Sequence, residues 1–196
     1  MRVLVFYAHP VETSFVAALH TRTIAMLRAQ GHEVDDCDLN AEGFNPVLTR
    51  QERIDYHDTG INRANVAGYV ERLLWAQALV FVYPVWNFGF PAILKGVFDR
   101  VFLPGVSFEM ANGAFVPGLR HIAKMTAVCT YGAARWRAWS MGDPPRKCVT
   151  RMIRVLIAPF ARSSYLACYD MNNTTPEKRA AFMVRVEAHF AGWQGG

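Results

Sequence analysis

The sequence predicts an α/β protein in which a doubly wound, five-stranded parallel sheet carries helices on both faces. Two observations predict this class. Short and nearly continuous apolar segments, such as Arg2–Tyr7 and Lys124–Thr130, have the composition of strands that are buried on both faces. Longer segments of helical periodicity separate them, which is the alternation that builds parallel sheets through crossover helices.

The first half of the chain supplies three strands, each followed by a helix. Gly31 closes the first helix, and the polar composition of the second strand predicts a place at the edge of the sheet. Pro84 is predicted to end the third strand. A loop-rich insertion, Asn40–Gly60, has one helical turn near Gln51–Ile54. In order, the predicted elements are strand Arg2–Tyr7, helix Ser14–Ala29, strand Glu33–Leu39, helix Asn65–Gln77, strand Ala78–Tyr83 and helix Ala92–Phe102.

The second half adds a hairpin and two more strand–helix units. Asn112-Gly113 within the turn-rich segment Val106–Val116 is typical of a type I′ hairpin turn. The remaining predicted elements are strand Lys124–Thr130, helix Arg146–Leu156, strand Ser163–Tyr169 and helix Pro176–His189. Five such units fit the flavodoxin-like arrangement.

The chain of 196 residues is predicted to be one domain, residues 1–196, because it holds no repeat, low-complexity tract or linker. A hydrophobic content of 52% with 19% charged residues is typical of a globular protein. No apolar run reaches the ~20 residues of a membrane-spanning helix, so membrane contact is expected to be peripheral at most. The short apolar start at Met1 is better explained as a buried strand than as a signal peptide.

Cysteine spacing and net charge limit the classes of partner. The four cysteines are scattered without a Cys-x-x-Cys pair or neighbouring histidines, which predicts free thiols in a reducing cytoplasm and no metal site. A net charge of +5 suits nucleic acid, anionic lipid or an anionic small molecule. No nucleic-acid-binding signature accompanies the charge. A phosphorylated cofactor is therefore the simplest explanation, with no nucleic-acid partner.

The loop between the first strand and its helix offers groups that bind a phosphate. It holds the imidazole of His9, the hydroxyls of Thr13 and Ser14, and the free N–H groups of a helix N-terminus. It has neither a Gly-x-Gly-x-x-Gly fingerprint nor a Walker loop. The alternative interpretation is that Thr13 or Ser14 only caps the helix.

A second loop, after the third strand, is aromatic and turn-prone. It places Trp86, Asn87, Phe88 and Gly89 beyond the carboxyl end of a strand, where open α/β sheets bind their ligands. Flat rings beside free backbone N–H groups suit a flat cofactor edged with heteroatoms, such as a flavin. The sequence therefore predicts a flavin site at this edge of the sheet.

Three motifs together carry a resemblance to a known family. The chain resembles the NAD(P)H:quinone oxidoreductases of the flavodoxin-like fold, the DT-diaphorase family, in order over about residues 1–132. The motifs are Ala-His-Pro-x-x-Thr-Ser-Phe at 8–15, Gly-Phe-Asn-Pro-Val-Leu at 43–48 and Phe-Gly-Phe-Pro-Ala-Ile-Leu-Lys-Gly-Val-Phe-Asp-Arg-Val-Phe at 88–102.

The resemblance implies a homodimer with flavin at its interface, which passes hydride from NAD(P)H to the flavin and then to a quinone in ping-pong fashion. The family positions also imply which residues bind the cofactor. Those around the phosphate and ribityl chain would be His9, Thr13, Ser14, Phe15 and Val16, those along one edge of the ring system Pro84, Val85, Trp86, Asn87 and Phe88, and those at its other end Thr130, Tyr131, Gly132 and Ala133.

The match fails after the fourth strand, where relatives carry a tyrosine and a histidine that stabilise reduced flavin. Residues 134–146 contain neither residue type. The candidates for catalysis here are Arg135, Trp136 and Tyr131. Arg135 would offset negative charge on reduced flavin or meet a nucleotide phosphate, unless it is a solvated surface residue. Trp136 would stack on a quinone or nicotinamide, or else serve as a core or dimer contact.

Several alternatives stay open at this point. The basic helix Arg146–Leu156 is explained by a solvated face, by the 2′-phosphate of NADPH or by contact with anionic lipid. The insertion with Gly43-Phe44-Asn45-Pro46 resembles users of FAD, with FMN as the alternative. Besides a quinone reductase, the sequence allows a flavodoxin-type one-electron carrier or a flavin-binding regulatory subunit of a membrane cation antiporter.

Overall fold

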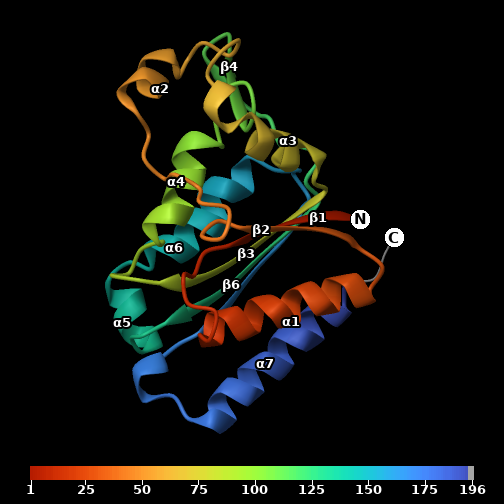
Figure 1. Cartoon of the computed structure of the whole chain (residues 1–196), viewed down its shortest axis with the longest axis vertical. Coiled ribbons are helices and arrows are strands. Elements are labelled where there is room, and N and C mark those ends of the chain that lie inside the picture. Colours follow the sequence, from red (N-terminus) through yellow and green to blue (C-terminus); the bar gives the residue numbers. More distant parts are fainter. Residues whose placement is uncertain (194–196) are drawn as a thin grey trace.

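Five parallel strands form the central sheet of the computed structural model, which describes residues 1–193 (Figure 1). Their spatial order is β2-β1-β3-β6-β7, so the chain starts one strand in from an edge, adds β2 at that edge and then builds toward the other edge. This confirms the predicted flavodoxin-like sheet and the edge position of the second strand. The strands are β1 (Arg2–Tyr7), β2 (Glu33–Asp38), β3 (Ala78–Val85), β6 (Lys124–Tyr131) and β7 (Arg162–Cys168).

Helices cover the two faces of the sheet as separate layers (Figure 1). On one face lie α1 (Phe15–Ala29) and α7 (Pro176–Ala191), which pack side by side. On the other face lie α3 (Ala67–Trp75), α4 (Ala92–Arg100) and the segment that begins with α6 (Pro144–Lys147). Every main connection therefore returns the chain to the amino end of the sheet, so that all five strands run in the same direction and their carboxyl ends meet at the opposite end.

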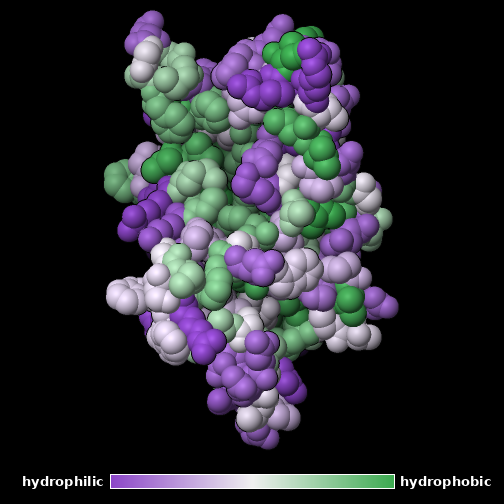
Figure 2. Space-filling view, turned by 90° about the vertical axis from the view of Figure 1, so that its left-hand side faces the viewer, coloured by the Kyte–Doolittle hydropathy of each residue, from purple (hydrophilic) through white to green (hydrophobic). Residues whose placement is uncertain are grey.

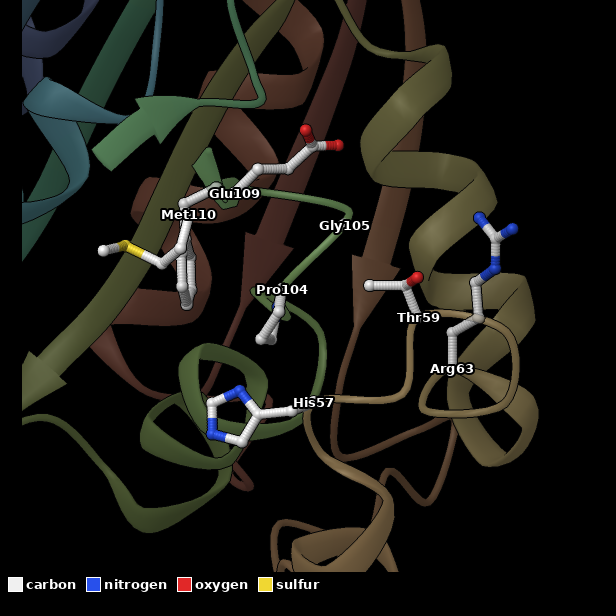
Figure 3. Close-up of a pocket in the computed structure, with 8 residues that line it drawn as sticks. His57, Thr59, Arg63, Pro104, Gly105, Glu109 and Met110 are labelled. Carbon is white, nitrogen blue, oxygen red and sulfur yellow. The ribbon is translucent and has the colours of Figure 1, made fainter. Parts of the chain in front are cut away.

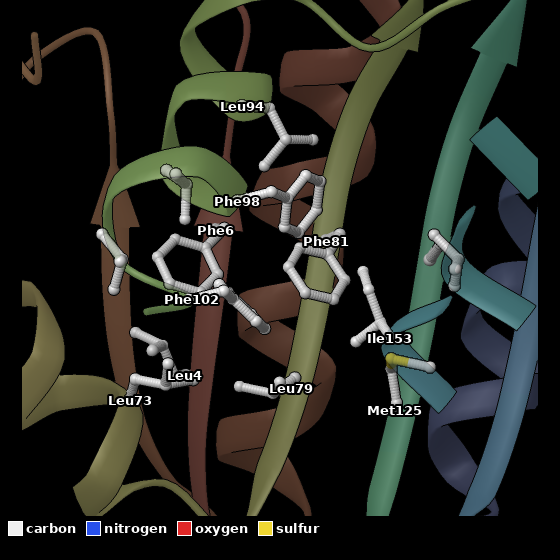
Figure 4. Close-up of a cluster of buried hydrophobic side chains, with 14 of the residues drawn as sticks. Leu4, Phe6, Leu73, Leu79, Phe81, Leu94, Phe98, Phe102, Met125 and Ile153 are labelled. Atoms are coloured by element: carbon white, nitrogen blue, oxygen red, sulfur yellow. The ribbon is translucent and has the colours of Figure 1, made fainter. Parts of the chain in front are cut away.

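Alternate residues of the strands supply two separate hydrophobic cores. Leu4, Phe6, Leu79 and Phe81 face α3 and α4 in the larger core (Figure 4). The smaller core joins the opposite sides of the same strands to α1 and α7; its strand members are Val3, Val5, Tyr7, Ala78, Val80, Val82, Val128, Leu166 and Cys168. Burial on both faces explains why these strands are apolar along nearly their whole length.

Two smaller elements follow the local sequence signals. The insertion contains α2 (Arg50–Asp55), whose N-terminus is closed by a capping box between Thr49 and Glu52. β4 (Phe108–Ala111) and β5 (Ala114–Pro117) form the predicted hairpin, with Asn112 and Gly113 at φ 53° and 78° as a type I′ turn requires.

The prediction of one continuous helix over Arg146–Leu156 is wrong. The chain instead passes from α6 into a π-helical turn, Cys148–Met152, and then a 3-10 turn, Ile153–Val155. Buried side chains recur every four residues here, at Pro145, Val149 and Ile153, whereas an α-helix repeats every 3.6 residues. A wider turn keeps these three residues on one face. The Thr150 hydroxyl also donates to the Arg146 carbonyl oxygen (2.7 Å), which competes with regular helix bonding.

The third strand also runs further than predicted, through Pro84 to Val85. Pro84 lies beyond the last pair between β1 and β3, which joins Tyr7 to Val82. Its missing N–H therefore removes no bond between those two strands. Helix α5 (Arg135–Ser140), which is only six residues long, was not predicted.

We expect Gly96→Ala to destabilise the fold by about 2 kcal/mol, because overpacking a tight contact has a typical effect of this size. A Cβ at Gly96 would lie 2.6 Å from the carbonyl oxygen of Pro46 and closer still to its Cα and Cβ. Gly68→Ala in α3 is the matched control, since its Cβ meets nothing within 4 Å. Urea unfolding of both variants measures the difference; equal stabilities would contradict the close packing of α4 on the insertion.

Candidate functional site

A pocket of about 500 Å³ opens where β1, β3 and β6 end. Its walls come from the loops after these strands, from the first turn of α1 and from the loop after β7. Figure 2 shows this side of the molecule, with apolar residues gathered among hydrophilic ones in its upper and middle part and mainly hydrophilic residues at its lower end. The lining residues are His9, Ser14, Phe15, Val16, Pro84, Val85, Trp86, Asn87, Thr130, Gly132, Met171 and Asn172.

The first turn of α1 presents unpaired donors to this pocket. Ser14 is the N-cap, and its hydroxyl accepts from the N–H of Ala17 at 3.1 Å. The helix geometry leaves the N–H groups of Phe15 and Val16 without intrahelical acceptors. No acidic side chain lies in this turn or among the lining residues. The positive end of the helix dipole therefore meets the pocket without a carboxylate to oppose it.

His9 is held as a neutral donor at the rim of the same pocket. Its Nδ1 accepts from the N–H of Val11 at 3.0 Å, so in the neutral ring the proton is on Nε2. Burial lowers the pKa of His9. Its ring meets Trp86 edge-on, with 5.8 Å between the centroids. The free Nε2–H group can donate to a phosphate oxygen without carrying a charge itself.

The loop after β3 is a tight turn pinned by its own backbone. The N–H of Trp86 donates to Gly89 at 3.2 Å, and the N–H of Gly89 donates to Trp86 at 2.8 Å. Asn87 and Phe88 between them have φ values of 49° and 57°. Left-handed backbone is costly for a bulky residue such as Phe88. The turn leaves the Trp86 side chain 47% exposed at the pocket mouth.

The loops after β6 and β7 are tied together on the remaining side. Asp170 donates its N–H to the carbonyl of Ala133 at 2.9 Å, and Asn172 donates to that of Gly132 at 3.3 Å. A Cβ on Gly132 would lie 3.2 Å from the Asn172 amide oxygen. Glycine at this position therefore allows the two loops to approach closely.

Most of the predicted cofactor-binding residues line this one pocket, although they come from three separate loops. Thr13, Phe88, Tyr131 and Ala133 do not line it, whereas Met171 and Asn172 do and were missed. The signal for the missed pair was available, because they follow the fifth strand at the same edge of the sheet.

The three predicted catalytic residues also lie outside this lining. Arg135 lines a neighbouring hollow, and Trp136 is 65% exposed on α5. Tyr131 is buried, and its hydroxyl donates to Asp143 and bonds the hydroxyl of Tyr165, both at 2.6 Å. Burial is the main cause of the raised pKa of Tyr131, with Cys129 and Asp143 adding to it.

The pocket fits a flavin nucleotide on its own chemistry. The two spare N–H groups of Phe15 and Val16 and the His9 donor suit a phosphate. At the other end, Trp86 and Pro84 supply apolar surface, and Asn87 and Thr130 supply groups that can hydrogen-bond a heteroatom edge. This combination of an anion site and a flat apolar wall is what the cofactor requires.

A second large hollow, of about 530 Å³, lies between the insertion and the β4–β5 hairpin (Figure 3). His57, Thr59 and Arg63 approach it from one side, and Glu109 and Met110 from the other. It lies away from the strand ends and holds residues of both charges, so it is not the phosphate site that the sequence predicts.

In the described part of the chain, no three His, Cys, Asp or Glu side chains gather at metal-binding distance, and no helix has the length and apolar character to span a membrane. All four cysteines are free thiols.

Comparisons with known proteins agree on one family for this chain. Residues 1–189 match the family described as having the flavodoxin-like fold. A Haemophilus influenzae protein named an uncharacterized NAD(P)H oxidoreductase is 34% identical over 134 residues, 68% of this chain and 65% of that one. NAD(P)H dehydrogenase (quinone) 1 of Rattus norvegicus is 31% identical over 127 residues, 57% of this chain and 46% of that one. The chain thus spans less than two thirds of the length of these curated relatives.

Solved structures agree over nearly the whole chain. A Streptococcus mutans protein superposes with a TM-score of 0.84 at 25% identity, covering 98% of this chain and 100% of that one. The NAD(P)H:quinone oxidoreductase of Methanothermobacter marburgensis superposes with a TM-score of 0.83 at 21% identity, covering 100% and 98%, and this likeness shows the fold alone. Together with the sequence matches, these findings confirm the resemblance that the motifs predicted.

Proposed function

Because this chain belongs to the family with the flavodoxin-like fold, we propose that it is a flavin-dependent NAD(P)H:quinone oxidoreductase. The observation that carries the proposal is the strand-tip pocket, which joins the α1 N-terminus to the Trp86 turn. The relatives named above as NAD(P)H oxidoreductase and NAD(P)H dehydrogenase (quinone) support the reaction class.

Each part of the pocket has one task in this proposal. His9 and the N–H groups of Phe15 and Val16 hold the phosphate, and Trp86 and Asn87 orient the ring system against the loop after β3. Bound flavin supplies two-electron hydride chemistry. NAD(P)H and the quinone use this pocket in turn, which is ping-pong order. The protein contributes orientation and electrostatics.

We also propose roles for the three candidate catalytic residues. Arg135 opens α5 three residues after Gly132 and supplies positive charge beside the pocket. Trp136 is exposed for contact with the ring of a substrate or a second copy of the chain. Tyr131 is buried beneath this loop, so we propose that it positions the loop through Asp143.

For the cofactor we propose FAD, with FMN as the alternative. The motif that favoured FAD has a packing role as well, since Phe44 is buried and Pro46 packs against Gly96. A relative from Beijerinckia indica, 33% identical over 90 residues, is named FMN-dependent. We further propose a homodimer with the flavin at its interface, which would cover Trp86 and the exposed rings of α5.

Anaerobic reduction of the purified protein tests the function directly. We expect a yellow protein that bleaches with NADPH or NADH and recovers its colour rapidly with menadione, and chromatography of the released flavin identifies FAD. Bleaching only with a separate reductase would indicate a one-electron carrier. Slow turnover with capture of a cation antiporter would indicate a regulatory subunit, and a colourless protein that takes up neither flavin would contradict the proposal.

A further inference from the structure

We propose that the hollow beside the flavin pocket binds the 2′-phosphate of NADPH, so that the protein prefers NADPH to NADH. This inference rests on the proposed function and names its cosubstrate. The hollow has a volume of about 360 Å³ and four cationic side chains in its walls. Its lining residues are Arg135, Trp139, Gly142, Asp143, Arg146, Lys147, Thr150, Arg151 and Tyr169.

The positive charge of this region has no matching negative charge. Residues 135–162 contain seven Lys and Arg residues against one acidic residue, Asp143, although the whole chain has a net charge of only +5. None of the seven takes part in an ion pair within the described residues. The carboxylate of Asp143 already accepts from the buried hydroxyl of Tyr131 at 2.6 Å. Four cations therefore line the hollow against a single carboxylate, that of Asp143, and this excess of positive charge favours an anionic ligand.

The local backbone brings these cations together. Lys147 ends α6, and Arg151 lies four residues later in the π-helical turn, so both point from the same side of the widened helix. Arg135 reaches the hollow from the start of α5, across the Gly142 turn. The sequence alone predicted an ordinary helix here, in which the cationic side chains would not share one side.

The hollow lies within reach of a ligand that also occupies the flavin pocket. Gly132 lines the flavin pocket and Arg135 lines the hollow. Arg135 follows Gly132 by three positions along the chain, a span of at most about 11 Å. Tyr169, which lines the hollow, packs on Tyr131, the residue before Gly132, with ring centroids 4.6 Å apart. An extended dinucleotide with its nicotinamide on the flavin can therefore place its adenosine end among these cations.

A phosphate monoester matches this set of donors. It carries a charge of about −1.5 to −2 at neutral pH and three strong acceptor oxygens. Arginine forks bind such oxygens in pairs. NADPH has this group and NADH lacks it, so the hollow predicts discrimination between the two nucleotides.

Steady-state kinetics of the flavin-loaded enzyme tests the inference. We expect Arg146→Gln/Arg151→Gln to raise the Michaelis constant for NADPH about tenfold, equivalent to about 1.4 kcal/mol, and to leave that for NADH within about twofold. Arg162→Gln is the control, because Arg162 is exposed at the opposite end of β7. Equal changes for the two nucleotides, or none for NADPH, would overturn the inference.

Calorimetry with adenosine 2′,5′-bisphosphate separates this inference from the proposed function, because it requires neither turnover nor reduction. We expect binding by the wild type and by Arg162→Gln, and loss of binding in the double variant. Vesicles of phosphatidylglycerol provide the other arm. A double variant that loses vesicle binding but retains the bisphosphate would assign the cations to lipid headgroups and overturn the nucleotide site.

Discussion

Replacing Ser14 by aspartate is expected to weaken flavin binding by on the order of a hundredfold while leaving the protein folded. Aspartate caps a helix as well as serine does, so α1 retains its N-cap. Its carboxylate would lie beside the Phe15 and Val16 N–H groups that we assign to the cofactor phosphate. Two negative charges about 4 Å apart near a protein surface repel by about 4 kcal/mol, which exceeds the roughly 3 kcal/mol of a hundredfold change.

Fluorescence titration of the apoprotein with flavin measures this effect. Thr49→Asp is the matched control, since Thr49 caps α2 with the same geometry but lies outside the pocket. The thermal midpoint of each apoprotein reports whether the fold is retained. If Ser14→Asp bound flavin as tightly as the wild type, the phosphate could not be assigned to the N-terminus of α1.

Replacing Arg100 by methionine is expected to destabilise the fold by about 3–5 kcal/mol, the usual effect of breaking a buried ion pair by removing one partner. The side chains of Arg100 and Glu52 are each only 8% exposed. Arg100 donates to Glu52 through Nε at 3.0 Å and also bonds the carbonyl of Asn45. The variant leaves the Glu52 carboxylate buried without its partner and releases the insertion from α4.

The loss of stability caused by Arg100→Met should become smaller as the pH falls. Burial alone would raise the pKa of Glu52, but hydrogen bonds from Arg100 and Thr49 lower it below 4.5. In the wild type this lowered pKa contributes stability above the unfolded-state pKa, and the contribution disappears as the pH falls through the folded-state value. In the variant the bonds from Thr49 remain but those from Arg100 are lost, so burial is opposed less and the pKa of Glu52 is higher than in the wild type. The carboxyl therefore protonates more readily, and the difference in stability between the two proteins narrows between about pH 7 and pH 4.

Urea unfolding at several pH values measures both effects. Arg22→Met is the control, because the Arg22–Glu187 pair is more exposed, at 48% and 28%, and such pairs contribute about 0–1 kcal/mol. A gap between wild type and Arg100→Met that stays constant with pH would show that Glu52 is not the residue left unpaired.

The fold was predictable because it depends on patterns that lie within single segments. Apolar runs, Gly31 and the Asn112-Gly113 turn each specify local geometry, and parallel strands separated by helices admit few arrangements. The loops at the strand ends could be predicted for the same reason, since any residue just after a strand lies at one edge of the sheet.

The errors occur where distant contacts decide the local structure. Whether residues 146–156 form a regular helix depends on the four-residue spacing of side chains that the sheet buries. The interaction of Arg100 with Glu52 joins residues 48 positions apart, and no local signal announces it. The Tyr131 hydroxyl faces Tyr165 and Asp143 and not the pocket, because alternate side chains of β6 point to opposite faces and Tyr131 shares the buried face of Cys129.

The left-handed turn from Trp86 to Gly89 has a consequence for affinity. Ordering a flexible loop upon ligand capture opposes binding by about 1–2 kcal/mol per residue in conformational entropy. Here two reciprocal backbone bonds hold the four residues before any ligand arrives, so folding itself has already absorbed that penalty. The strained backbone at Asn87 and Phe88 therefore accompanies a rigid turn, and this wall of the pocket is pre-organised for its ligand.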